Sequence, residues 1–219
     1  MKKETNISRF KEIDIYPVTC EKLSAGRSNI EILNAVVEGG AKIIQLREKD
    51  YSKKELYTLA VIFREITSRA NVLLIINDHL DIALAVEADG IHLGQDDLPI
   101  AVARKLAPEL LIGASTHSLQ QALKAQEDGA DYVNIGPIFP TKTKDGVVEY
   151  LGPEAISTIS PHLTVPFTVM GGINENNMDQ VITHGARRLA MVTAITQAPD
   201  IAATVRHFRN KINKTSLYK

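Results

Sequence analysis

The 219-residue sequence predicts an α/β protein in which one (β/α)8 barrel, the TIM barrel, takes up the whole chain. Apolar runs of strand length alternate with helical patterns, which predicts parallel strands joined by helical crossovers. Eight such strand–helix units follow one another, and eight parallel strands close into a barrel. Most of the strands are continuously apolar, as expected where helices cover them. A doubly wound open sheet is second choice, because the first strand–helix turn lacks a glycine-rich dinucleotide fingerprint.

The expected strands are short apolar runs bounded by glycine, proline or polar residues. They cover residues 13–19, 42–47, 73–76, 90–93, 110–115, 132–135, 167–170 and 188–192. The third strand is the clearest, because the apolar run 72–76 ends abruptly in Asn77 and Asp78.

The expected helices carry apolar residues three and four positions apart. They cover residues 29–38, 53–69, 80–86, 100–106, 119–128, 153–159, 176–183 and 200–212. Ser52, with Glu55 three positions later, matches a capping box, and Ser118 is a second good N-cap. Residues 137–151 have no apolar period and are expected to form a long loop, and the polar tail after residue 212 is expected to be mobile.

Composition is that of an ordinary globular protein, with 44% hydrophobic and 23% charged residues. The formal net charge of −1 gives no bulk attraction to nucleic acid or membranes, so any anion site is expected to be local. The single cysteine, Cys20, excludes an internal disulfide and suits a reducing compartment. With neither a secretory signal pattern nor a run of about 20 apolar residues, a cytoplasmic location is expected.

Carboxylates follow two neighbouring strands at the end of the predicted barrel where enzyme sites lie. Asp78 ends the third strand, and Asp96 and Asp97 follow the fourth. Because neighbouring parallel strands bring these carboxylates into one space, they suit a hard divalent cation such as Mg2+. Helix capping by the same aspartates is the alternative, and spacing does not choose between Asp96 and Asp97.

Basic and hydroxyl side chains follow other strands at the same end. Arg47 and Lys49 alternate on a strand end, so they face the same way and suit a phosphate or pyrophosphate. A surface ion pair with Glu48 or Asp50 is the alternative. Residues 141–144 offer two threonines and two lysines that suit closing over an anion, and a solvated loop is the alternative there.

The last two strands end in segments that suit a phosphate. Gly171-Gly172 and Val192-Thr193 follow them, where barrels often bind phosphate through backbone N–H groups. Simple turn geometry is the alternative for the glycines. His92 and His117 are expected to be hydrogen-bonded structural residues, and no zinc spacing or Ser-His-Asp arrangement is visible.

Five motifs occur in order along essentially the whole chain. They read Gln45-Leu46-Arg47-Glu48-Lys49, Asn77-Asp78, His92-Leu93-Gly94-Gln95-Asp96-Asp97, Gly136-Pro137-Ile138-Phe139-Pro140-Thr141-Lys142-Thr143-Lys144 and Gly171-Gly172-Ile173. Together they resemble the thiamine phosphate synthase family. The resemblance implies a (β/α)8 barrel enzyme that transfers a pyrimidinylmethyl group. Its implied reaction joins 4-amino-5-hydroxymethyl-2-methylpyrimidine diphosphate to 4-methyl-5-(2-hydroxyethyl)thiazole phosphate and releases pyrophosphate, with Mg2+ as cofactor.

The resemblance also implies roles for individual residues. Pyrimidine diphosphate contacts are implied at Gln45, Arg47, Lys49 and Asn77, pyrophosphate contacts at Ser115 and Lys144, and thiazole phosphate contacts at Thr141, Thr143, Gly172, Val192 and Thr193. Leu46, Glu48 and Lys142 belong to the same substrate-binding motifs. The implied catalytic residues are Arg47, Lys49, Ser115 and Lys144, and the implied ligands of one Mg2+ per site are Asp78 and Asp97.

Three positions depart from the family pattern. Cys20 stands where Asp is common, Met170 where a smaller residue is usual, and Thr193 where Ser is usual. The implied reaction is dissociative and needs neither a protein nucleophile nor a general base. A thiazole tautomerase of the same superfamily and an idle barrel that senses a phosphate ligand are the alternatives. A homo-oligomer is left open.

Overall fold

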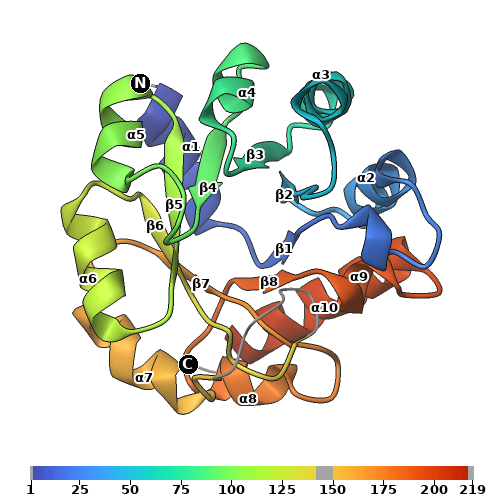
Figure 1. The fold of residues 1–219 in the computed structure, drawn as a ribbon. Helices are drawn as coiled ribbons and strands as arrows, with labels where there is room; N and C mark the ends of the chain where they lie inside the picture. Colours follow the sequence, from blue (N-terminus) through green and yellow to red (C-terminus); the bar gives the residue numbers. More distant parts are fainter. Residues whose placement is uncertain (1, 142–149, 217–219) are drawn as a thin grey trace.

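The computed structural model describes residues 2–141 and 150–216 and shows a parallel sheet curled into a barrel with helices around it (Figure 1). The strands are β1 (Ile15–Pro17), β2 (Ile43–Leu46), β3 (Leu73–Asn77), β4 (Gly90–Leu93), β5 (Leu111–Thr116), β6 (Tyr132–Ile135), β7 (Phe167–Val169) and β8 (Leu189–Met191). They pair in chain order from β2 to β8, and β8 pairs with β1. The barrel closes where Val18 bridges Gln45 and the Thr19 N–H donates to the Gln45 carbonyl at 3.0 Å. The predicted (β/α)8 fold is confirmed.

Helices connect successive strands, and others lie before the first strand and after the last. They are α1 (Lys2–Lys11), η1 (Glu21–Leu23), α2 (Asn29–Glu38), α3 (Lys53–Arg69), α4 (Leu80–Ala85), α5 (Ile100–Leu106), α6 (Leu119–Glu127), α7 (Glu154–Ile159), η2 (Ser160–His162), α8 (Met178–Thr183), α9 (Thr193–Thr196) and α10 (Ile201–Ser216). The expected bounds of α2 and α5 are confirmed, as are the N-caps Ser52 and Ser118.

The helix prediction is wrong or incomplete in two respects. The final helix does not end at residue 212, because α10 continues to Ser216. Neither α1 nor the short α9 was expected. Most of the long loop predicted at 137–151 falls on residues 142–149, which lie outside the described residues. Among the helices of the described segments, none has both the length and the apolar character needed to cross a bilayer.

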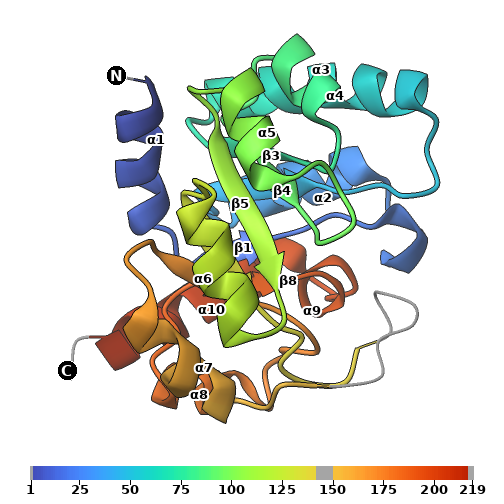
Figure 2. The ribbon, with the colours of Figure 1, turned by 60° about the vertical axis from the view of Figure 1, so that its left-hand side comes forward.

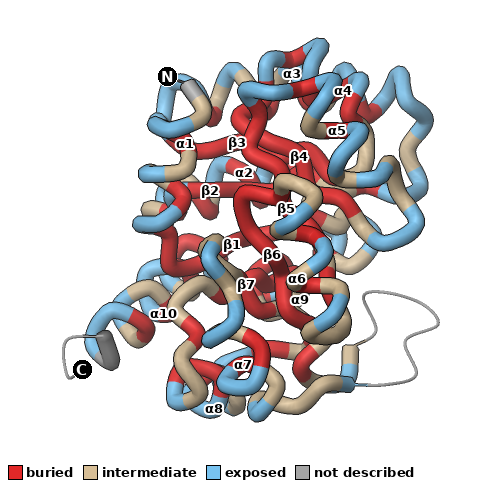
Figure 3. The backbone as a smooth tube through the Cα atoms, turned by 90° about the vertical axis from the view of Figure 1, so that its left-hand side faces the viewer, coloured by how far each residue is buried: buried red, intermediate tan, exposed pale blue. Residues whose placement is uncertain are grey.

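Two apolar cores lie on the two faces of the sheet. Ile43, Leu73 and Ile75 point into the barrel, whereas the alternate residues Ile44 and Leu74 pack against the helices. Figure 3 shows the buried residues gathered on the strands and the exposed ones on the outer helices. Because both faces are covered, the strands are apolar throughout, and the alternation is hidden in the sequence.

Helix α1 covers the end of the barrel where the strands begin (Figure 2). Its Phe10 is buried and stacks on Tyr132, the first residue of β6, with ring centroids 4.1 Å apart. Phe10 therefore belongs to the interior core and seals it from solvent at this end. Only the opposite end, where the strands stop, is left for a site.

Three aspartates lock the strand starts. Each is buried, directly precedes a strand, accepts a backbone N–H at 2.7–2.9 Å and pairs with an arginine. The pairs are Asp14 with Arg209, Asp89 with Arg64, and Asp131 with Arg104. In a barrel, polar residues at the strand starts serve stability, whereas those at the strand ends serve chemistry.

Candidate active site

A cavity of about 490 Å3 opens at the C-terminal ends of the strands. It brings together eleven of the residues expected at a site. They are Gln45, Arg47, Lys49, Asn77, Asp78, Asp97, Ser115, Thr141, Gly172, Val192 and Thr193. These residues come from seven of the eight strand ends, so the fold gathers in one place what the chain spreads over about two-thirds of its length.

Two expected substrate-binding side chains point elsewhere. Leu46 is fully buried in the core between the sheet and its helices. Glu48 turns outward and accepts the Glu21 N–H on both carboxylate oxygens at 3.1 Å, and its burial raises its pKa. The side-chain roles expected for both are therefore corrected, because residues one apart on a strand face opposite sides. Lys142, Thr143 and Lys144 lie outside the described residues.

The carboxylates of Asp78 and Asp97 lie together on one wall of the cavity. Asp78 has a left-handed backbone with φ of 59°, and its N–H donates to the His92 carbonyl at 2.9 Å. Asp97 accepts the Gly94 N–H at 2.7 Å, and Lys49 forms an ion pair with Asp78. Asp96 also lines the cavity, but it is Asp97 that comes within hydrogen-bonding reach of Asp78.

The charges on this wall suit a divalent cation. Burial, and then the nearby Asp78 carboxylate, raise the pKa of Asp97. Two carboxylates that disfavour each other's ionisation attract a cation between them, and the Lys49 ammonium already lies against one of them. Within residues 2–141 and 150–216, no third Asp, Glu, His or Cys joins them in a metal-binding cluster. The pair therefore fits Mg2+, which takes one or two carboxylates and leaves other positions to substrate oxygens.

The floor of the cavity is polar and continuous with a buried hydrogen-bonded chain. His92 contacts the Ser115 hydroxyl through Nε2 at 2.9 Å and the Tyr132 hydroxyl through Nδ1 at 3.1 Å. The Tyr132 hydroxyl lies 3.0 Å from that of Tyr16, which accepts from Gln45 Nε2 at 2.9 Å. Burial lowers the pKa of His92 to about 4 and raises the pKa of both tyrosines, so all three are neutral at pH 7.

The opposite wall is made of tight backbone turns. Gly171 and Gly172 have φ of 105° and 63°, conformations that favour glycine. A Cβ on Gly172 would lie 2.3 Å from the Pro140 carbonyl oxygen, so the two loops approach as closely as glycine allows. Thr193 begins the short helix α9 directly after β8, and the first turn of a helix has N–H groups with no intrahelical acceptor. Barrels often bind phosphate in this arrangement.

Comparison with known proteins identifies the family. The family model for thiamine monophosphate synthase matches residues 15–195. The chain is 45% identical over 202 residues to the thiamine-phosphate synthase of Dictyoglomus thermophilum, covering 92% of this chain and 91% of that protein. It is 44% identical over 215 residues to that of Pelotomaculum thermopropionicum, covering 98% and 99%. The chain belongs to the thiamine monophosphate synthase family. It is therefore an enzyme, a transferase that acts on small molecules.

A solved structure supports the same assignment for this synthase family member. The thiamine phosphate pyrophosphorylase of Pyrococcus furiosus superposes with a TM-score of 0.86 and 34% identity, covering 95% of this chain and 98% of that one. A 3-hexulose-6-phosphate synthase superposes with a TM-score of 0.67 at 18% identity, which shows the shared barrel alone.

Asn134 lines the synthase cavity although the sequence did not lead us to expect it there. His117, expected to be structural, and Met170, expected only as a departure from the family pattern, line it as well. The Asn134 side-chain oxygen accepts from Thr168 at 2.8 Å, so its NH2 group is the part left to donate. The signal for Asn134 was available, because a polar residue inside a buried strand, two positions after Tyr132, must face the barrel interior.

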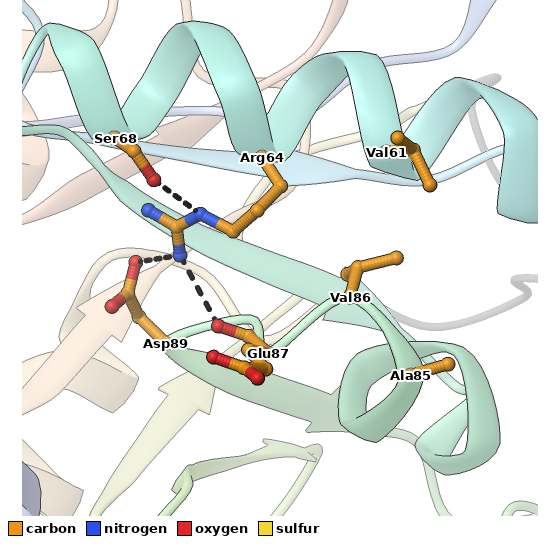
Figure 4. Close-up of a pocket in the computed structure, with 7 residues that line it drawn as sticks. All are labelled: Val61, Arg64, Ser68, Ala85, Val86, Glu87 and Asp89. Carbon is orange, nitrogen blue, oxygen red and sulfur yellow. Dashed lines mark hydrogen bonds and ion pairs between the residues drawn. The ribbon is translucent and has the colours of Figure 1, made fainter.

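A second hollow, of about 560 Å3, lies on the outside of the synthase barrel (Figure 4). It lies between α3 and the turn into β4, at the strand starts. Arg64 crosses it and donates to Ser68 at 2.8 Å, to Asp89 at 2.8 Å and to the Glu87 carbonyl at 3.4 Å. These contacts hold α3 against the turn into β4.

Proposed function

We propose that this synthase family member condenses 4-amino-5-hydroxymethyl-2-methylpyrimidine diphosphate with 4-methyl-5-(2-hydroxyethyl)thiazole phosphate, giving thiamine phosphate and pyrophosphate. The observation that supports the proposal is a single cavity with two groups of residues suited to anions. One wall has Arg47, Lys49 and a carboxylate pair suited to a metal, and the other has the turns at Gly172 and Thr193. A diphosphate and a monophosphate would thus be held on opposite sides of one space.

The proposal includes one Mg2+ held by Asp78 and Asp97. The closeness of these carboxylates, the raised pKa of Asp97 and the Lys49 ammonium against Asp78 support a cation at this point. When bound, Mg2+ would supply positive charge to the diphosphate oxygens. Two protein ligands leave most of an octahedral coordination shell open, which suits a metal that arrives with a diphosphate.

The cavity residues suit a dissociative transfer, in which the bond to pyrophosphate breaks before the bond to the thiazole forms. Arg47 and Lys49 would bind the diphosphate and stabilise the negative charge that grows as the bond from methylene carbon to oxygen breaks. The electron pair of that bond leaves with pyrophosphate, and the aminopyrimidine spreads the positive charge left on its methylene. Gln45 and Asn77 would orient this ring. The thiazole nitrogen, placed by its phosphate at Gly172 and Thr193, then forms the new bond to carbon.

The other two readings fit the cavity less well. A thiazole tautomerase needs neither a diphosphate site nor a metal pair, yet the cavity has both Asp78 and Asp97 beside Arg47 and Lys49. A sensor of phosphate ligands would have no use for a second anion site. The cytoplasmic location, the lack of nucleic-acid partners and the homo-oligomer considered from the sequence stay predictions.

An assay of pyrophosphate release tests the function. We expect release only when both substrates and Mg2+ are present, with thiamine phosphate formed in equal amount. Release from the pyrimidine diphosphate alone would indicate a hydrolase, and isomerisation of a thiazole precursor without release would indicate a tautomerase. Either outcome would contradict the proposal.

Lys144 gives a direct test of how the leaving group is stabilised. Lys144 is expected to contact pyrophosphate. Lys144→Ala should therefore raise the activation free energy of the chemical step by about 2–4 kcal/mol, the cost of losing one preorganised charge-stabilising contact. Single-turnover kinetics at saturating substrate measure that step. A rate equal to that of the wild-type enzyme would remove Lys144 from the catalytic set.

A further inference from the structure

The strongest unexplained feature is the buried chain of hydrogen bonds that crosses the barrel interior. It runs from Gln45 through Tyr16, Tyr132 and His92 to Ser115, with contacts of 2.9, 3.0, 3.1 and 2.9 Å. Only its two ends and His92 line the cavity, and the tyrosines lie beneath it. Each tyrosine is at most 1% exposed. The proposed chemistry uses Gln45, and the family resemblance implies a pyrophosphate contact for Ser115, but the residues between these two have no role.

The order of donors and acceptors along this chain follows from Gln45. Its Nε2 can only donate, so the Tyr16 oxygen accepts there and the single Tyr16 hydrogen points to the Tyr132 oxygen. Tyr132 in turn gives its hydrogen to His92 Nδ1. A neutral imidazole that accepts at Nδ1 carries its hydrogen on Nε2, which lies against the Ser115 oxygen. Ser115 therefore accepts from His92, and its own hydrogen is left for the cavity.

With Gln45 Nε2 against the Tyr16 hydroxyl, as the structure has it, the opposite order leaves a buried hydrogen unpaired. If His92 donated from Nδ1 to Tyr132, the Tyr132 hydrogen would point to Tyr16. Tyr16 would then accept from both Gln45 and Tyr132, and its own hydrogen would have no acceptor along the chain. Leaving a buried donor unpaired is costly, so the order that starts at Gln45 is favoured.

Neighbouring residues make room for the hydrogen-bond chain and hold its end in place. A Cβ on Gly113 would lie 2.4 Å from the Tyr132 hydroxyl oxygen and 2.6 Å from His92 Nδ1. Glycine at this strand position therefore gives room for the contact between Tyr132 and His92. Gln95 donates to the Ser115 carbonyl at 2.6 Å and fixes the backbone that carries the hydroxyl.

We propose that Gln45, Tyr16, Tyr132 and His92 form a one-directional hydrogen-bond chain that fixes Ser115 as a hydrogen-bond donor to an anionic substrate oxygen. Tyr16, Tyr132 and His92 are then positioning residues, because they act through Ser115. Phosphate oxygens only accept hydrogen bonds, so a serine whose oxygen is already occupied by His92 is preset for them. The identity of the anion, the leaving pyrophosphate, rests on the proposed function.

The hydrogen position on His92 tests the chain without any assay of activity. Carbon and nitrogen chemical shifts of labelled histidine distinguish the two neutral forms, and a His92→Gln variant identifies the signals. We expect the hydrogen on Nε2 in the ligand-free protein at pH 8, and a shift toward a mixture of forms in Tyr132→Phe. A hydrogen on Nδ1 in the wild-type protein would overturn the proposal.

Kinetics test whether the chain acts through Ser115. Tyr132→Phe should lower kcat about 10-fold with a smaller change in KM, because the lost orientation matters most as charge develops. Tyr16→Phe removes an equally buried hydroxyl one step further away and should cost about threefold by the same reasoning. Ser115→Ala combined with Tyr132→Phe should be no slower than Ser115→Ala alone. Additive losses in the double variant would overturn the proposal.

Thr67→Val is the matched control. The Thr67 hydroxyl is also fully buried, but it donates to the Phe63 carbonyl within α3, away from the cavity. Thr67→Val should lose thermal stability to a similar degree as Tyr132→Phe and Tyr16→Phe, but it should keep wild-type kinetics. If the wild-type protein shows no condensation at all, the proposed function is wrong. The hydrogen position on His92 still tests the direction of the hydrogen-bond chain in that case.

Discussion

At the residue scale, the cavity concentrates charges that oppose one another. Asp78 and Asp97 share one wall, and the pKa of Asp97 is raised by burial and by that neighbour. A carboxyl whose pKa is raised on folding costs stability when it ionises. The contribution of Asp97 to the free energy of unfolding therefore falls as the pH rises from the ordinary Asp pKa toward the raised pKa of the folded protein. The site thus holds a strain that a bound cation would relieve.

Asp97→Asn separates this strain from function. The amide removes the repulsion and can still accept the Gly94 N–H. We expect the metal-free variant at pH 7 to be as stable as the wild type or more stable by up to about 1 kcal/mol, the range for charge pairs that solvent reaches. Mg2+-dependent turnover should be lost. Urea unfolding and the pyrophosphate assay measure the two effects, and a clearly less stable variant would contradict this account.

Gly172→Ala tests the close approach of two loops. The added Cβ would meet the Pro140 carbonyl oxygen at 2.3 Å, and the wall that should hold the thiazole phosphate must move. We expect kcat/KM for thiazole phosphate to fall by about 100-fold, as misplacement near a reacting group does. Gly26→Ala is the control, because Gly26 also has a positive φ, of 81°, but no atom within 4 Å of an added Cβ. If both variants keep wild-type activity, the turn has no part in substrate binding.

At the scale of elements, helix caps set where helices begin, whereas strand ends direct side chains into the cavity. Ser52 starts α3 with a complete capping box, in which its side chain accepts the Glu55 N–H and the Glu55 carboxylate accepts the Ser52 N–H. The cap fixes where the helix begins, at Lys53, four residues after Lys49. Strand β2, in contrast, ends by directing Gln45 and Arg47 to the cavity and Leu46 to the helices.

Ser52→Ala should therefore affect stability and leave the site intact. Loss of an N-cap side chain costs about 1 kcal/mol of unfolding free energy. Ser157→Ala, on the exposed surface of α7, removes a serine that caps no helix and should cost much less. Thermal or urea unfolding of the two variants compares these values. Equal stability of the two would show that the capping box contributes nothing measurable.

At the scale of the whole molecule, the barrel is closed at one end and open at the other. Helix α1 and its Phe10 seal the strand starts, and the three Asp–Arg pairs fasten them. The cavity occupies the strand ends. The buried chain of Tyr16 and Tyr132 connects the two halves, because Tyr132 stacks on Phe10 and also contacts His92.

Phe10→Ala should destabilise the whole barrel. A large aromatic side chain that is 1% exposed leaves a cavity when truncated, and such changes cost about 3–5 kcal/mol. Tyr57→Ala, at a position that is 45% exposed on α3, should cost far less. Chemical unfolding monitored by circular dichroism gives both values. A Phe10→Ala protein as stable as wild type would mean that α1 does not seal the interior.

Local chemistry in the sequence was enough to predict the barrel and most of its elements. Glycines, prolines and N-caps mark the boundaries, and the order of apolar runs sets the fold class. Helix α1 was missed because residues 2–11 carry little apolar character of their own, and only docking under the barrel makes Phe10 part of a core. Propensity alone could not reveal that contact.

The sequence also determined which residue types meet at the site, since carboxylates, cations and glycines follow successive strands and parallel strands align their ends. Tertiary structure decided which side chains face inward. In a strand that is apolar on both faces, the pattern does not show the direction, so Leu46 and Glu48 were grouped with Gln45 and Arg47 although they turn away. Only the tertiary structure showed the hydrogen-bond chain that connects Gln45 to Ser115, because no local pattern encodes contacts between side chains on five different strands.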